Sequence, residues 1–142
     1  MRIVYRTGAH TKHRLLFHIV FVPKYRRRVL QHDLATRLAK LFWQGCQMND
    51  WGVEKLEILP DHVHLLLQLN PVDSVANVLQ ILKGGSSRVI REEFPELEEF
   101  LWGDSLWGDG YFVETIGRTT ETAIRRYLDN QQNKQGERYP GL

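Results

Sequence analysis

The sequence predicts an α+β domain, in which a four-stranded antiparallel sheet carries two helices on one face. Short runs rich in branched and aromatic residues, typical of strands, alternate with two longer segments whose apolar residues recur at helical spacing. The order of these elements is β-α-β-β-α-β, with one more helix after it. This order is the ferredoxin-like, or RRM-like, split βαβ arrangement.

The length of 142 residues and the hydrophobic fraction of 42% predict one domain, residues 1–142, with its own core. Within it we expect a flexible arm over residues 1–12 and a C-terminal helix over residues 118–135. The single cysteine, Cys46, excludes an internal disulfide and suits a reducing compartment. No apolar run reaches the roughly 20 residues of a membrane span, so we expect a cytoplasmic protein without a membrane partner.

The first strand is expected over residues 14–22, which are β-branched, aromatic or otherwise apolar apart from Arg14 and His18. Pro23 follows and ends it. Asp33 is placed to cap the first helix, which runs to about Asn49. Gly52 then breaks the helical pattern.

The second strand, over residues 53–59, is joined to a third over residues 61–69 by a turn at Pro60-Asp61. Asp73-Ser74 opens the second helix, which extends toward Phe94. Gly84 and Gly85 in its middle cost about 1 kcal/mol each relative to alanine. They indicate either close approach of a phosphate or backbone, or a plain break between two helices.

The last part of the chain combines aromatic residues with one more strand and helix. Trp102 and Trp107 lie in an irregular segment and are expected as aromatic lids on the core. Residues 111–115 predict the final strand. After Gly117, a threonine-rich start predicts the last helix, which ends near Gly136.

The third strand carries the first candidate site. His62 and His64 are two apart, so their side chains lie on one face, about 6.6 Å apart along the backbone. Val63 and Leu65 then point the other way, into the core. Two imidazoles on one face form half of a metal site, although paired histidines on a half-exposed strand are more often ordinary surface or interface residues than ligands. The strand by itself leaves both interpretations open.

The last helix supplies the complementary half. Tyr127 and Gln131 are four apart, so they are neighbours on one helix face. A tyrosine hydroxyl is a competent nucleophile once its proton is removed, and an amide oxygen is a weak metal ligand. Alone, Tyr127 is better explained as an aromatic residue at the edge of the core, and it becomes a candidate nucleophile only together with the histidine strand.

Charge is distributed unevenly along the chain. Residues 1–40 hold ten Lys or Arg against one acid, whereas Glu92 to Asp109 hold seven acids and no base. A basic end suggests a polyanionic partner, but a solvated basic face balanced by the acidic segment is an equal alternative. The candidate phosphate contacts are Lys24, Arg26, Arg27, Arg28, Lys83 and Arg88.

Several blocks, taken together, resemble one known family. They are residues 17–26, 59–65, 82–88 and 101–111, followed by Tyr127-x-x-x-Gln131. In order and spacing they resemble the small single-tyrosine transposases of bacterial and archaeal insertion sequences, which belong to the HUH (His-hydrophobic-His) endonucleases. The resemblance covers nearly the whole chain, and a double glycine at 84–85 departs from the single one that the family leads us to expect.

The resemblance implies a mechanism. His62, His64 and Gln131 would bind Mg²⁺ or Mn²⁺, and Tyr127 would attack single-stranded DNA to form a 5′-phosphotyrosine link with release of a 3′-hydroxyl. The family also implies imperfect hairpins as DNA partner. It further implies a homodimer in which the tyrosine helix of one subunit completes the site of the other, with Gly117 as hinge.

Three alternatives stay open on the sequence. A non-catalytic ferredoxin-like nucleic-acid-binding regulator would keep the basic face and need neither histidine. A zinc metallohydrolase would use His62 and His64 without forming a DNA adduct. A domesticated single-tyrosine relative would act on chromosomal repeats.

Overall fold

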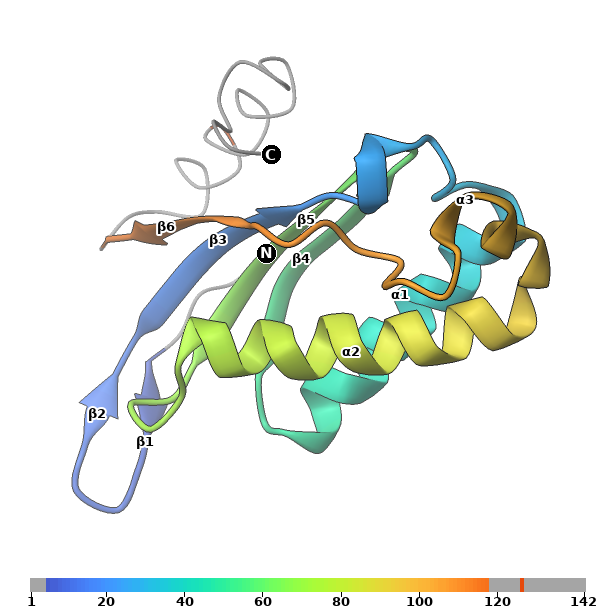
Figure 1. The fold of residues 1–142 in the computed structure, drawn as a ribbon. Coiled ribbons are helices and arrows are strands. Elements are labelled where there is room, and N and C mark those ends of the chain that lie inside the picture. The colour runs from blue at the N-terminus through green and yellow to red at the C-terminus, as the bar shows by residue number, and fades with distance from the viewer. Residues whose placement is uncertain (1–4, 118–125, 127–142) are drawn as a thin grey trace.

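The computed structural model describes residues 5–117 and Arg126 (Figure 1). Its central sheet has the strand order β4-β5-β3-β6, and each neighbouring pair is antiparallel. The strands are β3 (Leu15–Phe21), β4 (Gly52–Leu59), β5 (His62–Leu69) and β6 (Phe112–Ile116). The predicted fold class is therefore confirmed, while the added C-terminal helix over 118–135, with Tyr127 and Gln131, lies outside the described residues apart from Arg126.

Two long helices, α1 (His32–Met48) and α2 (Val75–Glu93), cover the same face of the sheet (Figure 1). Alternate residues of β5, among them Val63 and Leu65, are fully buried against them. Phe42 of α1 and Leu79 of α2 belong to the same core. This arrangement follows from the strand period of two, which sends every second side chain to the helices.

The helix starts differ in how they are capped. The Ser74 hydroxyl accepts a hydrogen bond from the backbone N–H of Asn77 at 3.1 Å, as expected of an N-cap. At α1 the N-cap is Gln31, without a side-chain cap bond, and Asp33 lies inside the first turn. Asp33 is therefore no cap, and its negative charge instead suits the positive end of the helix dipole.

Helix α2 runs without interruption through Gly84 and Gly85, so the interpretation as a helix break was wrong. The next turn is held by tertiary contacts. Trp107 Nε1 donates to Ser86 Oγ at 3.0 Å, and the backbone N–H of Leu106 donates to Ser87 Oγ at 3.0 Å. These contacts, with burial of the apolar side of the helix, outweigh the low helix propensity of glycine.

The segment after α2 contains η2 (Pro95–Leu97) and α3 (Glu98–Leu101). Trp107 is buried and packs edge-on against Phe21, with ring centroids 4.8 Å apart. Trp102 is 86% exposed because it follows α3 in the left-handed region and turns outward. The expectation of an aromatic lid holds for Trp107 and was wrong for Trp102.

Part of the expected arm forms secondary structure. Strands β1 (Arg6–Thr7) and β2 (Lys12–His13) form a hairpin that projects from one end of the sheet (Figure 1). Arg6 Nη1 donates to the backbone carbonyl of Asp50 at 2.7 Å and to Asn70 Oδ1 at 3.0 Å. Those bonds tie the hairpin to the body of the protein. No helix among the described residues is long and apolar enough to cross a membrane.

Candidate active site

The face of the sheet opposite the helices carries three histidines, which we call the histidine face: His18, His62 and His64. His62 and His64 come from β5, and His18 comes from β3. The register places Val20 opposite His64, so His18, two residues earlier, lies on the same face. All three side chains are at most 3% exposed, so the strand is buried on both faces rather than half exposed.

Asp61 orients the His62 ring. His62 Nδ1 lies 2.7 Å from Asp61 Oδ1, and Arg26 Nε donates to Asp61 Oδ2 at 3.2 Å. An ionised carboxylate can only accept, so Nδ1 of His62 carries a proton, and in the neutral ring Nε2 then keeps a lone pair. That Nε2 atom is buried and has no hydrogen-bond partner among the described residues. A carboxylate behind an imidazole in this way is the usual support of a metal-binding histidine.

The environment keeps Asp61 ionised. Burial acts to raise its pKa, but the hydrogen bonds from His62 and Arg26, together with the positive charge of Arg26, bring the pKa below its ordinary value. The charged form is the one that fixes the His62 tautomer. The three side chains thus form a chain from Arg26 on the loop after β3 to His62 on β5.

The second pair is formed by His18 and His64. His18 Nε2 and His64 Nδ1 are 3.1 Å apart, and their rings are stacked with an interplanar angle of 8°. Burial lowers the pKa of His18 to about 4, against the opposing effect of the Glu114 charge, and lowers that of His64 to about 3. Both rings are therefore neutral at pH 7, the form in which an imidazole binds a metal.

The ring centroids of His62 and His64 are 4.8 Å apart, which is compatible with both contributing to one divalent ion. Within the described ranges no group of three His, Cys, Asp or Glu side chains could hold a metal. A third ligand, expected at Gln131, would come from outside those ranges. Two imidazoles match Mn²⁺ better than Mg²⁺, which prefers oxygen ligands.

Three of the six expected phosphate contacts are engaged within the protein. Lys24 Nζ forms an ion pair with Asp104 at 3.1 Å, and Arg26 bonds Asp61. Lys83 Nζ donates to the carbonyl of Gly108 at 2.7 Å, and burial lowers its pKa. The sequence pattern does not distinguish such structural cations from those that face a partner.

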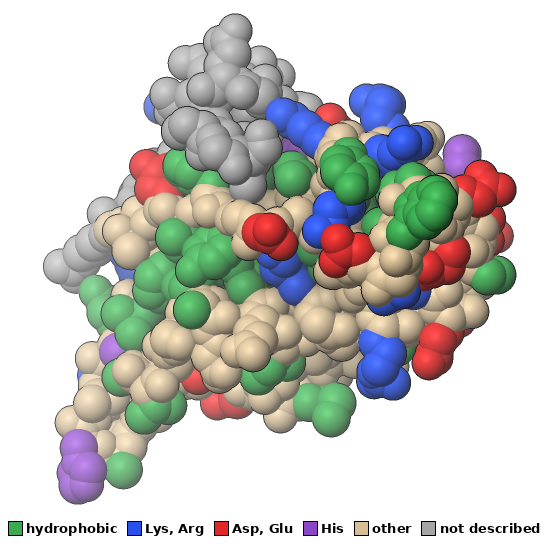
Figure 2. Space-filling model, in the orientation of Figure 1, with side chains coloured by type: hydrophobic (Ala, Val, Ile, Leu, Met, Phe, Trp, Pro, Cys, Tyr) green, Lys and Arg blue, Asp and Glu red, His purple; other side chains and the backbone are tan. Residues whose placement is uncertain are grey.

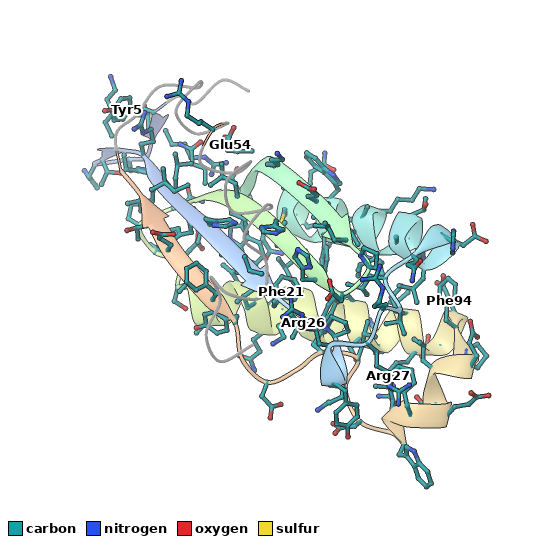
Figure 3. The ribbon with its side chains drawn as sticks, turned by 90° about the horizontal axis from the view of Figure 1, so that it is seen from above. Tyr5, Phe21, Arg26, Arg27, Glu54 and Phe94 are labelled. Atoms are coloured by element: carbon teal, nitrogen blue, oxygen red, sulfur yellow. The ribbon has the colours of Figure 1, made fainter. Side chains whose placement is uncertain are left out.

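The other three cations are exposed. Arg27 lies over the Phe100 ring, 4.5 Å from its centroid, and Figure 3 shows it farther from the sheet than Arg26. Arg28 and Arg88 are also exposed. On the face shown in Figure 2, Lys and Arg interleave with Asp and Glu around η1 (Lys24–Arg26) and α3. This matches the alternative of a basic segment balanced by the acidic one.

Sequence analysis missed two residues of the site. His18 stood in the predicted first strand, but its place beside His64 depends on the register between β3 and β5. Asp61 was interpreted only as a turn residue, although it precedes His62 directly. Its carboxylate next to a candidate ligand was the signal that could have found it.

Comparison with known proteins places the chain among transposases. The model of the family described as "Transposase IS200 like" matches residues 11–131. The ISDra2 transposase TnpA of Deinococcus radiodurans is 33% identical over 130 residues, which cover 92% of this chain and 93% of the relative. The transposase for insertion sequence element IS200 of Salmonella typhimurium is 33% identical over 139 residues, covering 94% and 91%.

Two solved structures are similar in fold. A putative transposase from Deinococcus radiodurans has a TM-score of 0.73 at 32% identity and covers 89% of this chain and 97% of its own. A REP-associated tyrosine transposase bound to a REP hairpin has a TM-score of 0.61 at 15% identity, covering 95% and 73%. The second likeness, at this identity, concerns the fold alone.

Proposed function

The chain belongs to the family of IS200-like transposases, and from that premise we propose that it cleaves and rejoins single-stranded DNA at the ends of an insertion sequence. Membership implies a DNA cleavage and strand-transfer enzyme. Single-stranded DNA as the substrate, the nucleophile and the metal go beyond membership and are part of the proposal.

The observation that carries the proposal is the buried Nε2 atom of His62, whose lone pair is fixed by Asp61. Burying a polar nitrogen without a partner costs free energy, and a bound ion would recover it. His64 adds a second neutral imidazole on the same face. We propose that His62, His64 and Gln131 bind one divalent ion, Mn²⁺ or Mg²⁺, which when bound would polarise a phosphate oxygen as a Lewis acid.

Tyr127 is the proposed nucleophile. Its hydroxyl oxygen attacks the scissile phosphorus, a P–O bond to tyrosine forms, and the bond from phosphorus to the 3′-oxygen breaks. The tyrosine loses a proton and the departing 3′-oxygen gains one. A second 3′-hydroxyl can reverse the step on the phosphotyrosine, and because the phosphodiester energy is retained, joining needs no ATP.

The proposed DNA partner is a single strand with an imperfect hairpin. The REP-associated transposase is described as bound to a hairpin, which makes this class of partner reasonable here. Arg27, Arg28 and Arg88 are the best candidates for phosphate contacts because they are exposed. We further propose a homodimer in which Tyr127 reaches the histidine face of the partner subunit, acting in the cytoplasm on the host's own DNA.

The test is covalent attachment. A labelled hairpin-bearing single strand from the DNA flanking the gene is incubated with protein and Mn²⁺ or Mg²⁺, then run on a denaturing gel. We expect a protein-DNA adduct that Tyr127→Phe abolishes and that a chelator prevents. Cleavage by Tyr127→Phe equal to wild type would refute the proposed nucleophile.

The same experiment separates the alternatives. A non-catalytic regulator would bind the strand without any adduct, and a zinc metallohydrolase would cleave small esters without one. Catalysis between subunits is tested by mixing Tyr127→Phe with His64→Ala. Recovery of adduct in the mixture is expected, whereas a monomer by sedimentation that still forms adduct would contradict the dimer.

A further inference from the structure

A hollow of about 360 Å³ lies between η1 and the segment 108–110. Pro23, Tyr25 and Arg26 line one side of it, and residues 108–110, Asp109 among them, line the other. Lys83 Nζ donates to the carbonyls of Gly108 and Gly110, at 2.7 and 3.4 Å. The partly buried ammonium group of Lys83 thus holds the segment 108–110 in place.

The Tyr25 backbone is in an unfavourable conformation. Its φ is 59° and that of Arg26 is 52°, so two consecutive non-glycine residues occupy the left-handed region. The Tyr25 ring is 73% exposed, so burial of the ring does not offset this strain. Hydrogen bonds hold the loop instead: Lys24 N–H to the Leu106 carbonyl at 2.7 Å, and Arg26 N–H to the Pro23 carbonyl at 2.8 Å. Strain maintained in this way is concentrated at functional sites.

The hollow adjoins the histidine face. Arg26, which lines it, bonds Asp61, and Asp61 in turn bonds His62. The loop after η1 is also bonded to the turn between β4 and β5, because Leu30 N–H donates to the Pro60 carbonyl at 3.0 Å. A strand whose phosphate lies at the histidines would therefore bring a neighbouring nucleotide to Tyr25.

We propose that Tyr25 and this hollow bind one unpaired nucleobase flanking the scissile phosphate, a subsite that rests on the proposed function. The exposed ring offers a stacking surface, as aromatic side chains do in proteins that bind single strands. The Asp109 carboxylate can accept a hydrogen bond from an exocyclic amino group. Thymine has only its N3–H to donate, and the carbonyl oxygens on both sides of that group repel a carboxylate, so the subsite favours adenine, cytosine or guanine over thymine.

A phosphate fits the hollow less well than a base. Arg26 is already paired with Asp61, and the Lys83 ammonium donates to the loop carbonyls. Asp109 would repel a phosphate that entered. A planar base instead meets an aromatic ring, backbone groups and one acceptor.

The experiment measures strand binding without metal, so that no cleavage is needed. A fluorescein-labelled single strand with its hairpin, taken from the DNA flanking the gene, is altered to an abasic site at one position after another. For the wild type, one position near the cleavage site should weaken binding about 5- to 150-fold, the range expected for one stacked base. Restoring thymine there should recover less affinity than restoring cytosine or adenine.

The key variant is Tyr25→Gly, because glycine accepts a positive φ and so removes the ring without harming the fold. Its melting temperature should equal or exceed that of the wild type, while its binding should be weak and indifferent to the abasic position. Tyr25→Phe should keep the sensitivity, and Asp109→Asn should reduce the discrimination against thymine. Trp102→Gly is the matched control, since Trp102 is also exposed at positive φ (53°) but lies elsewhere.

Tyr25→Gly binding that stays as sensitive to the abasic site as the wild type overturns the proposal, as does a scan without any sensitive position. Loss of the same size in Trp102→Gly would also overturn it, because the effect would not be specific to the hollow. Failure of the proposed function looks different. The wild type would then form no adduct with Mn²⁺, whatever the abasic scan in binding shows.

Discussion

The two faces of the central sheet use alternate residues of the same strands for opposite purposes. On the helix side, β5 buries Val63, Leu65 and Leu67 against α1 and α2. On the other side it buries His62 and His64 beside His18. Apolar burial stabilises the fold directly, whereas buried imidazoles cost free energy unless each polar atom finds a partner. The comparison teaches that the helix side carries the stability, whereas the histidine side is where we propose that the chemistry takes place.

The largest expected effect is on the histidine side. His64→Ala removes a proposed nitrogen ligand, so adduct formation should fall by about 100-fold or more, since even loss of a supporting residue costs 10- to 100-fold. The measurement is the rate of adduct formation on a denaturing gel in Mn²⁺. Val72→Ala, at a side chain that is 93% exposed, is the control. If His64→Ala is folded and forms adduct at the wild-type rate, the proposal that the histidine face carries the chemistry is contradicted.

Leu65 follows His64 on the strand, and Leu65→Ala should lower the stability of the fold without changing the rate of adduct formation. Its side chain is fully buried, so a cavity should lower the free energy of unfolding by about 2–5 kcal/mol. Urea unfolding measures the change, with Ile81→Ala, on the exposed side of α2, expected within about 0.5 kcal/mol of wild type. Well below its melting temperature, the folded Leu65→Ala protein should form adduct at the wild-type rate. A slower rate of adduct formation by Leu65→Ala, at the same folded fraction as the wild type, would contradict this expectation.

A smaller effect is expected from Asp61, which orients a ligand without being one. Asp61→Ala removes the acceptor for His62 Nδ1, so Mn²⁺ affinity should fall about 10- to 100-fold. Isothermal titration of Mn²⁺ into the protein measures it. Asp61→Asn keeps an acceptor oxygen but loses the charge, and an intermediate affinity is expected. Equal affinity in Asp61→Ala and wild type would show that the carboxylate does not support the site.

The smallest effect concerns α2 on the helix side. Ser74→Ala removes the N-cap hydrogen bond to Asn77 and should cost about 1 kcal/mol of unfolding free energy. Ser74→Gly should cost only a few tenths of a kcal/mol, because glycine is a tolerated cap. Both are measured by urea unfolding, and both should bind Mn²⁺ as the wild type does. A change in Mn²⁺ affinity would mean that the two faces are coupled through α2.

Much of the architecture follows from local pattern. The order of strands and helices, the turn at Pro60-Asp61 and the opening of α2 at Ser74 each depend on a few neighbouring residues, and each is found where it was expected. The same holds for the shared face of His62 and His64, because the strand period is two. Asp33 as a cap and the break at Gly84 were wrong. At Gly84 the reason is tertiary, because the next turn of α2 bonds Leu106 and Trp107.

By itself, then, the sequence determined the fold class, the histidine pair and the family. The first two depend on periodicity and on residues close together in the chain, and the family depends on short blocks whose order and spacing can be read along the chain. Only the tertiary structure decided that His18 stacks on His64, that Asp61 joins Arg26 to His62, and that Lys24 and Lys83 serve the fold. Strand register and the partners of long side chains are set by packing across the whole domain. No local pattern contains that information.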